Sequence, residues 1–181
     1  YDNTETDEGA VFLWYGASAF GTGADGNPAN AAWMAQSDQA GASFGLSVGT
    51  AGDVNGDGYS DIIVGAYLYD NGTTDEGAAF LWHGSAAGPG ASGTPANAVW
   101  RAEGAVTDGE FGYSVATVGD VNGDGFADVI ISATHYTLSF GQVWVWQGGP
   151  AGLGSAGTAS NADWTRFASA PESKYGYVAG T

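Results

Sequence analysis

Apolar residues fall into short alternating or continuous runs along the chain, and no segment shows a convincing helical period. In the central part of the chain we expect four strands, at residues 44–50, 61–66, 78–83 and 98–102. The first and last of these runs alternate, the second is rich in β-branched residues, and the third is rich in aromatic residues. Turn-rich stretches lie between them. The pattern is therefore typical of an all-β protein.

The same sequence elements recur at a fixed distance, so the chain contains a repeated unit. Phe44-Gly-Leu-Ser-Val matches Phe111-Gly-Tyr-Ser-Val, and Tyr175-Gly-Tyr-Val begins a further copy. Asp61-Ile-Ile-Val-Gly-Ala matches Asp128-Val-Ile-Ile-Ser-Ala at the same distance of 67 residues. Four strands in each unit, repeated along the chain, predict the four-stranded antiparallel blades of a β-propeller.

The tryptophans follow the repeat as well. All but Trp144 belong to one of two series that recur at about the same distance. With one residue of each series per blade, at strand positions, packing between blades is favoured over a platform for stacking sugars. The two series are Trp14, Trp82, Trp146 and Trp33, Trp100, Trp164.

Each of two units contains an acidic loop, which covers residues 53–61 in the first and 120–128 in the second. Oxygen-bearing side chains stand at alternate positions, and glycines stand where the backbone must turn sharply. Ca²⁺ takes about 6–8 oxygen ligands, which such a loop supplies, whereas Mg²⁺ prefers a smaller shell that retains water. We therefore expect two Ca²⁺ sites in this chain.

The predicted ligands are the side chains at loop positions 1, 3, 5 and 9 and the main-chain carbonyl at position 7. An EF-hand would need an acid at position 12, where Val64 and Ile131 stand, and helices on both sides. A dockerin-type loop also continues into a helix, and a solvated acidic turn without metal is the remaining alternative. The ligands are Asp53, Asn55, Asp57, Tyr59 and Asp61 in the first loop, and Asp120, Asn122, Asp124, Phe126 and Asp128 in the second.

The order of motifs in each unit resembles the FG-GAP repeat, the blade unit of the integrin α-subunit propeller and of many bacterial extracellular proteins. These motifs are Phe-Gly, then Asp-x-Asn-x-Asp-Gly-x-x-Asp, then Gly-Ala. The resemblance covers nearly the whole chain, although Tyr67 and Thr134 stand where the family often has proline. It implies a propeller whose metal loops lie on one side of the ring and whose ligands are usually held on the other.

The register of the repeat predicts where the blades begin and end. We expect the later strands of one blade at residues 1–43, complete blades at 44–110 and 111–174, and the start of a next blade at 175–181. With a period of 67 residues, the chain holds about 2.7 blades, whereas propellers close with about 4–8.

An open arc exposes strand edges, which natural β-proteins avoid. We therefore expect a segment of a longer polypeptide, or copies that associate to complete a ring or stack. The expected partners are thus the rest of the same propeller or further copies of the chain, with a protein or glycan ligand in addition. Residues 84–94 and 148–158, which join third and fourth strands, are the first candidates for contacts with a neighbour.

Composition narrows the function further. Twenty acidic residues against three basic ones give a net charge of −17, which repels nucleic acid and anionic membranes. The chain has no cysteine, so calcium loops take the place of disulfides in bracing loop-rich structure. Such loops fill readily outside cells, so we expect an extracellular or cell-surface protein. No membrane-spanning run is present in the sequence.

Other motifs carry less weight. The acidic segments 2–8 and 70–76 favour solvated hairpin loops, and Asn71-Gly-Thr is a sequon that an Asn-Gly turn explains equally well. The glycine-rich segment 21–26 matches a dinucleotide-binding pattern without the required βαβ context. His83 and His135 occupy non-equivalent positions, which is typical of structural histidines.

We therefore expect a non-enzymatic, calcium-stabilised propeller segment that acts in adhesion, ligand binding or extracellular assembly. Two alternatives stay open. One is the scaffold of a secreted polysaccharide- or lipid-degrading enzyme whose catalytic residues lie outside this segment. The other is a structural subunit of an extracellular filament.

Overall fold

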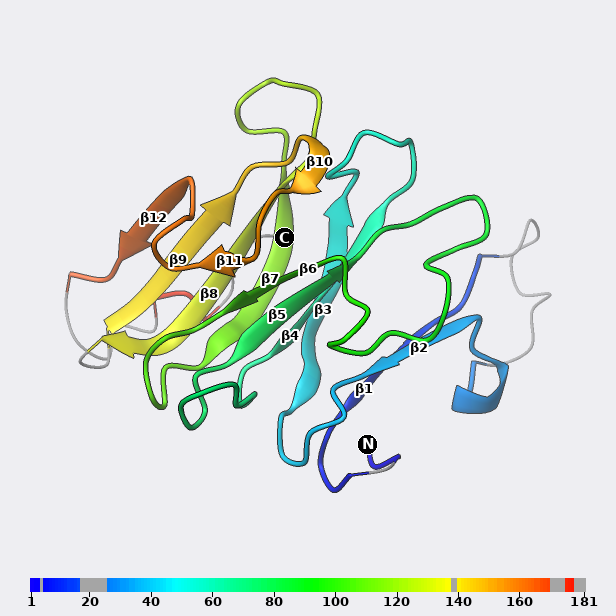
Figure 1. Cartoon of the computed structure of the whole chain (residues 1–181), viewed down its shortest axis with the longest axis horizontal. Coiled ribbons are helices and arrows are strands. Elements are labelled where there is room, and N and C mark those ends of the chain that lie inside the picture. The colour runs from blue at the N-terminus through cyan, green and yellow to red at the C-terminus, as the bar shows by residue number, and fades with distance from the viewer. Residues whose placement is uncertain (4, 17–25, 138–139, 170–174, 178–181) are drawn as a thin grey trace.

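The computed structural model describes residues 1–3, 5–16, 26–137, 140–169 and 175–177. These residues form three β-sheets that lie side by side (Figure 1). A short 3-10 helix, η1 (Pro28–Asn30), is the one helical element among them. No helix in the described ranges is long and apolar enough to cross a membrane. The chain is therefore all-β, as its apolar pattern predicts.

The sheets follow one another along the chain, and neighbouring strands within each repeat are antiparallel. The first sheet contains β1 (Ala10–Leu13) and β2 (Trp33–Gln36). The second contains β3 (Phe44–Gly52), β4 (Asp61–Ala66), β5 (Ala78–Trp82) and β6 (Trp100–Glu103), with β11 (Gly157–Thr158) added parallel to β6. The third contains β7 (Phe111–Gly119), β8 (Asp128–Thr137), β9 (Phe140–Trp146) and β12 (Trp164–Phe167), and β10 (Pro150–Leu153) lies in its last connection.

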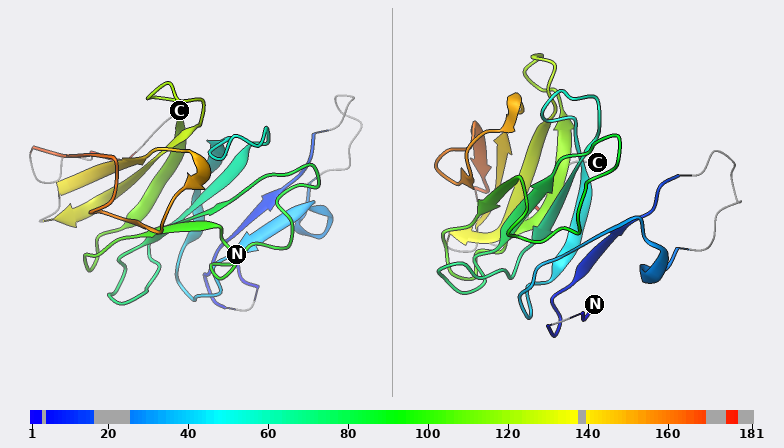
Figure 2. Two further views of the ribbon diagram at one scale, coloured as in Figure 1. Left: turned by 45° about the horizontal axis from the view of Figure 1, so that its top comes forward. Right: turned by 45° about the vertical axis from the view of Figure 1, so that its right-hand side comes forward.

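The four strands expected between residues 44 and 102 are confirmed as β3 to β6, and their ends differ from the prediction by at most two residues. The third sheet repeats the order, so the architecture is that of propeller blades. Figure 2 shows the sheets from two further sides, with β3 and β7 adjacent where the second and third sheets meet. The parallel addition of β11 to β6 is not visible in the apolar pattern, because it depends on a neighbouring sheet.

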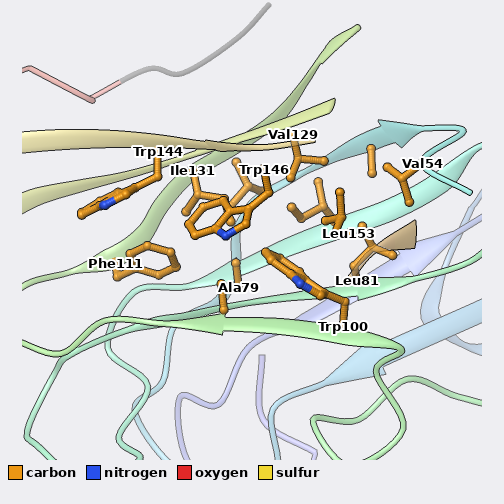
Figure 3. Close-up of a cluster of buried hydrophobic side chains, with 14 of the residues drawn as sticks. Val54, Ala79, Leu81, Trp100, Phe111, Val129, Ile131, Trp144, Trp146 and Leu153 are labelled. Atoms are coloured by element: carbon orange, nitrogen blue, oxygen red, sulfur yellow. The ribbon is translucent and has the colours of Figure 1, made fainter. Parts of the chain in front are cut away.

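The hydrophobic core lies between the sheets, in one cluster at each interface. Trp33 of the first sheet packs edge-on against Trp82 of the second, with 5.6 Å between ring centroids. Trp100 of the second sheet meets Trp146 of the third in the same way at 5.5 Å, as Figure 3 illustrates. Each pair contains one tryptophan of each series, and its two members belong to neighbouring sheets. The predicted packing between blades is therefore confirmed for both pairs.

The Phe-Gly pair at the start of each repeat has a steric explanation. A Cβ added at Gly112 would overlap the carbonyl oxygen of Ala78 in the preceding sheet, and its φ is +85°. The carbonyl oxygen of Phe111, the residue before Gly112, lies directly against Gly77. A side chain at position 77 would overlap it, so that position also requires glycine. Tyr175 lies against Gly141 in the same arrangement, so the third copy of the motif begins with the same packing.

Candidate metal centre

The two acidic loops connect the first and second strands of the second and third sheets. They leave β3 and β7 at the same end of the sheets, the upper end in Figure 1. Both are short connections held by glycines with positive φ, among them Gly56 at +73° and Gly58 at +89°. Since L side chains rarely adopt these angles, the glycines allow the loop to curl around its own side-chain oxygens.

In the first loop, side-chain oxygens accept hydrogen bonds from main-chain N–H groups of the same loop. The carboxylate of Asp53 accepts from Asp57 at 3.0 Å and from Gly58 at 2.8 Å. The amide oxygen of Asn55 accepts from Asp57 at 3.1 Å, and the carboxylate of Asp57 accepts from Tyr59 at 2.9 Å. Ligand candidates 1, 3 and 5 thus belong to one compact turn.

The second loop repeats this pattern. The carboxylate of Asp120 accepts from Asp124 at 3.0 Å and from Gly125 at 2.8 Å. Asn122 accepts from Asp124 at 3.0 Å, and Asp124 accepts from Phe126 at 3.0 Å. Two loops with different neighbours share one set of hydrogen bonds, so the Asp-x-Asn-x-Asp-Gly sequence itself determines this conformation.

The last acid of each loop has a different environment. Asp61 and Asp128 are 1% and 0% exposed, whereas the other predicted ligands of both loops are partly or fully exposed. One oxygen of Asp128 accepts from Val121 at 2.8 Å, and the other accepts from Gly148 of the connection after β9 at 2.9 Å. This aspartate therefore ties the loop to a second connection of its own sheet.

Hydrogen bonds and burial move the loop pKa values in opposite directions. The side-chain amide of Asn55 and the main-chain N–H of Tyr59 hold the pKa of Asp57 below its ordinary value. The main-chain N–H of Gly125 contributes most to lowering the pKa of Asp120. Burial raises the pKa of Asp61, although its two main-chain donors oppose this. The carboxylates of Asp57 and Asp120 thus stay ionised at neutral pH, as a cation ligand must.

The loops supply the right donors but are not arranged as a closed cage. Among the described residues, no three acidic, histidine or cysteine side chains come together in a group that could hold a metal ion. The carboxylates are instead engaged by main-chain N–H groups. The donor set of each loop, three carboxylates with an amide oxygen and a main-chain carbonyl, still fits the chemistry of a hard cation such as Ca²⁺.

The two acidic segments 2–8 and 70–76 each end in a buried glutamate, which the expectation of a solvated loop does not include. Glu8 is 0% exposed and Glu76 is 4% exposed. Glu76 accepts hydrogen bonds from the main-chain N–H groups of Asn71 at 2.8 Å and Thr73 at 3.1 Å. That expectation is wrong for these two glutamates, and their recurrence directly before Gly-Ala is the signal that could have identified them.

The sequence also singled out a histidine and a glycine-rich segment, which the structure does not place in a candidate site. His135 lies 2.7 Å from Glu110, which also contacts the hydroxyl of Thr134. The pair joins β8 to the turn that precedes β7, as a structural histidine does. Most of the glycine-rich segment 21–26 lies outside the described residues.

A groove of about 410 Å³ lies between β1 and β3, beside the first acidic loop. Its lining is mostly apolar and includes Val11, Leu13 and Val48. Val48 is 49% exposed, whereas the equivalent Val115 is 4% exposed and lies against the second sheet. At the interface between the second and third sheets, the equivalent place is filled by β3 and β4, which pack against β7. We therefore assign the groove to the packing of sheets rather than to a small ligand.

Comparison with known proteins agrees with this geometry. The FG-GAP repeat family matches residues 44–82 and 111–146. Among curated proteins, integrin alpha-PS2 of Drosophila melanogaster is 36% identical over 118 residues, which cover 64% of this chain and 8% of that protein. Integrin alpha-6 of Gallus gallus is 34% identical over 111 residues, and integrin alpha-IIb of Homo sapiens is 37% identical over 118 residues. These matches cover 61% and 62% of this chain but only 10% and 11% of the two relatives.

Proposed function

We propose that this chain is a calcium-stabilised segment of an extracellular β-propeller with a binding or adhesive, non-catalytic role, because the FG-GAP repeat family matches two of its segments and integrin α subunits are among its relatives. The relatives are integrin α subunits, and the chain corresponds to a small part of each. The binding or adhesive role of the whole protein is therefore proposed here together with that of the segment.

The observation that carries the calcium assignment is the concentration of negative charge in the two loops. Each loop holds three carboxylates within nine residues, and Coulomb repulsion between like charges opposes a compact turn. Among the described residues the ion pairs are Arg101 with Glu103 and His135 with Glu110, so no lysine or arginine pairs with a loop carboxylate. His83 makes only a minor electrostatic contribution at Asp57 and Asp61. A divalent cation relieves this repulsion, and the ligands are those named above, Asp53 to Asp61 and Asp120 to Asp128.

We also propose the blade boundaries at residues 44–110 and 111–174, with 1–43 and 175–181 in the flanking blades. The repeated packing of phenylalanine or tyrosine carbonyls on glycines of the preceding sheet supports this division. Partners of the assembled protein are then other blades or subunit chains, together with a protein or glycan ligand. An extracellular location follows from the calcium concentration that such loops need.

Thermal unfolding with and without calcium tests the proposal. Binding to the folded state alone stabilises it by about 2.7 kcal/mol at 100 times the dissociation constant. We therefore expect the melting temperature to rise with Ca²⁺, to rise much less with Mg²⁺ at equal ionic strength, and to fall back with a chelator.

Asp57→Ala and Asp124→Ala should each remove part of the rise, and the double variant should remove nearly all of it. Glu5→Ala, which removes an exposed negative charge outside the loops, is the matched control and should keep the full response. A melting temperature that does not respond to Ca²⁺ in the unmodified chain would contradict the assignment.

A further inference from the structure

The two acidic loops lie against each other, although their sequences start 67 residues apart. The main-chain carbonyl of Asp53, the first residue of the first loop, accepts a 2.9 Å hydrogen bond from the N–H of Ala127 in the second loop. A Cβ added at Gly56 of the first loop would lie 2.6 Å from the ring of Phe126 in the second. The loops are therefore in contact through both main chain and side chain.

A hydrogen-bonded path also joins the last acids of the two loops. The carboxylate of Asp128 accepts from the N–H of Gly148 at 2.9 Å. The adjacent Gly149 donates its N–H to the carbonyl of Val54 at 2.9 Å. Val54 in turn donates its own N–H to the carboxylate of Asp61, also at 2.9 Å. We call this path, from Asp128 to Asp61, the loop bridge. It connects a predicted ligand of the second loop with one of the first.

The loop bridge is buried. Val54 and Asp128 are both 0% exposed, and Asp61 is 1% exposed. Val54 also belongs to the same hydrophobic cluster as Leu153 of β10 (Figure 3). Hydrogen bonds away from water are stronger than exposed ones, and salt screens them less. A shift of one carboxylate is therefore expected to change the main chain of the other loop.

Gly148 leaves the loop bridge little room to adjust. A Cβ added there would lie 2.3 Å from the carbonyl oxygen of Ala127 in the second loop. It would lie 2.8 Å from the carbonyl oxygen of Val54 in the first. Both loops thus contact one residue, which cannot move toward one of them without changing its contact with the other.

We propose that the two loops bind Ca²⁺ with positive cooperativity, because each loop holds the main chain of the other. This inference rests on the calcium sites of the proposed function. Binding at one loop fixes its last acid, and through the loop bridge it orders residues that the other loop must also order. The second ion then binds a loop that is already partly ordered, so it binds more tightly. Couplings between sites typically change affinity by about 5–150-fold, equally in both directions.

Charge alone predicts the opposite result. Each loop carries three carboxylates, so its charge is −3 when empty and −1 with one Ca²⁺. An ion in one loop therefore reduces the negative potential that attracts an ion to the other loop. Because the two effects have opposite signs, charge cannot produce positive cooperativity.

Calorimetric titration with Ca²⁺ of the unmodified chain and of two single variants measures the coupling. Asp57→Ala and Asp124→Ala should each bind one ion, and the unmodified chain should bind two. Without coupling, the overall binding constant for two ions equals the product of the two single-loop constants. Charge changes this product little, because a loop that has lost one carboxylate carries −2, midway between −3 and −1. We expect the overall constant to exceed the product by about 5-fold or more.

Gly149 offers a matched pair of variants that remove no predicted ligand. Gly149→Pro removes the N–H that donates to Val54, whereas Gly149→Ala keeps it. A Cβ added at Gly149 has only the carbonyl oxygen of Gly152 near it, at 3.8 Å, so alanine fits. The same titrations in each background should keep the excess with alanine and abolish it with proline.

Hydrogen exchange gives a second reading that does not need the proline variant to fold. In Asp57→Ala, Ca²⁺ fills the second loop alone, yet it should slow exchange of the Val54 N–H in the first loop. The double variant Asp57→Ala, Asp124→Ala is the control, and Ca²⁺ should leave its exchange at Val54 unchanged.

The outcomes separate this inference from the calcium assignment. Two bound ions with an overall constant equal to the product would overturn the coupling and leave the calcium sites in place. An excess that Gly149→Pro retains, or exchange at Val54 that ignores Ca²⁺ in Asp57→Ala, would also overturn the loop bridge. An unmodified chain that binds no Ca²⁺ would overturn both proposals.

Discussion

Asp61 accepts a 2.9 Å hydrogen bond from the main-chain N–H of Gly84, 23 residues further along the chain. Its second oxygen accepts from the N–H of Val54, also at 2.9 Å. The buried carboxylate thereby connects the first acidic loop to the segment that follows β5. A residue expected to close the metal shell thus also supports the fold, and the two roles can be separated by experiment.

Asp61→Ala should destabilise the protein even in a chelator. The change leaves the N–H groups of Val54 and Gly84 without their acceptor in a buried place, and each such loss costs about 1–3 kcal/mol. We expect a decrease of about 3 kcal/mol in the free energy of unfolding, measured by urea denaturation without metal. Asp57→Ala, whose carboxylate is exposed, should change the metal-free stability much less, and equal losses in both variants would contradict this division of roles.

Gly77→Ala should lower the free energy of unfolding more than the replacement of a glycine that has only a left-handed backbone conformation to preserve. Gly77 has a φ of +78°, and an added Cβ would overlap the carbonyl oxygen of Phe111. Gly41 has nearly the same φ, +75°, with no atom within 4 Å of its Cβ position. Gly41→Ala should lose about 1–2 kcal/mol from backbone strain alone. Denaturation curves of both variants give the difference, which measures the contact between the sheets.

Local patterns account for much of the fold and of the candidate site. The strands near residues 44–102 and the two acidic loops are predictable because alternation, β-branching and Asp-Gly spacing act over a few residues. The burial of Glu76 and the pairing of Gly157 with Ala102 are not, because they depend on partners in distant segments. The engagement of Asp61 by Gly84 is missed for the same reason, since a loop sequence does not reveal which connection packs beside it.

Trp144→Phe should be tolerated or slightly stabilising. Trp144 is 0% exposed and lies beside Phe111 and Tyr136, and within the described part of the chain its indole N–H has no hydrogen-bond partner. Phe80 stands at the equivalent place in the second sheet, so a smaller ring without a donor suits the site. Trp144→Ala should instead cost about 3–5 kcal/mol through the cavity it leaves. A loss of similar size in Trp144→Phe, measured by denaturation, would contradict this expectation.

Asp75→Asn should stabilise the protein at neutral pH and lose that advantage in acid. Burial raises the pKa of Asp75, and the carboxylates of Asp70, Asp108 and Glu110 raise it further. The folded protein therefore binds more protons than the unfolded chain between the ordinary value of 3.8 and the higher folded pKa. Stability from this group falls as the pH rises through that window, and asparagine, which never ionises, avoids the loss.

The measurement is the difference in unfolding free energy between Asp75→Asn and the unmodified chain, followed from neutral pH downward in a chelator. The difference should favour the variant at neutral pH and shrink as the pH approaches 3.8, because Asp75 is then protonated in both states. Asp38→Asn makes the same exchange at another residue of positive φ, +55° against +49°, and controls for the backbone. A pH-independent difference would place the effect in the backbone or in hydrogen bonding rather than in the burial of the Asp75 charge and its repulsion by the other three carboxylates.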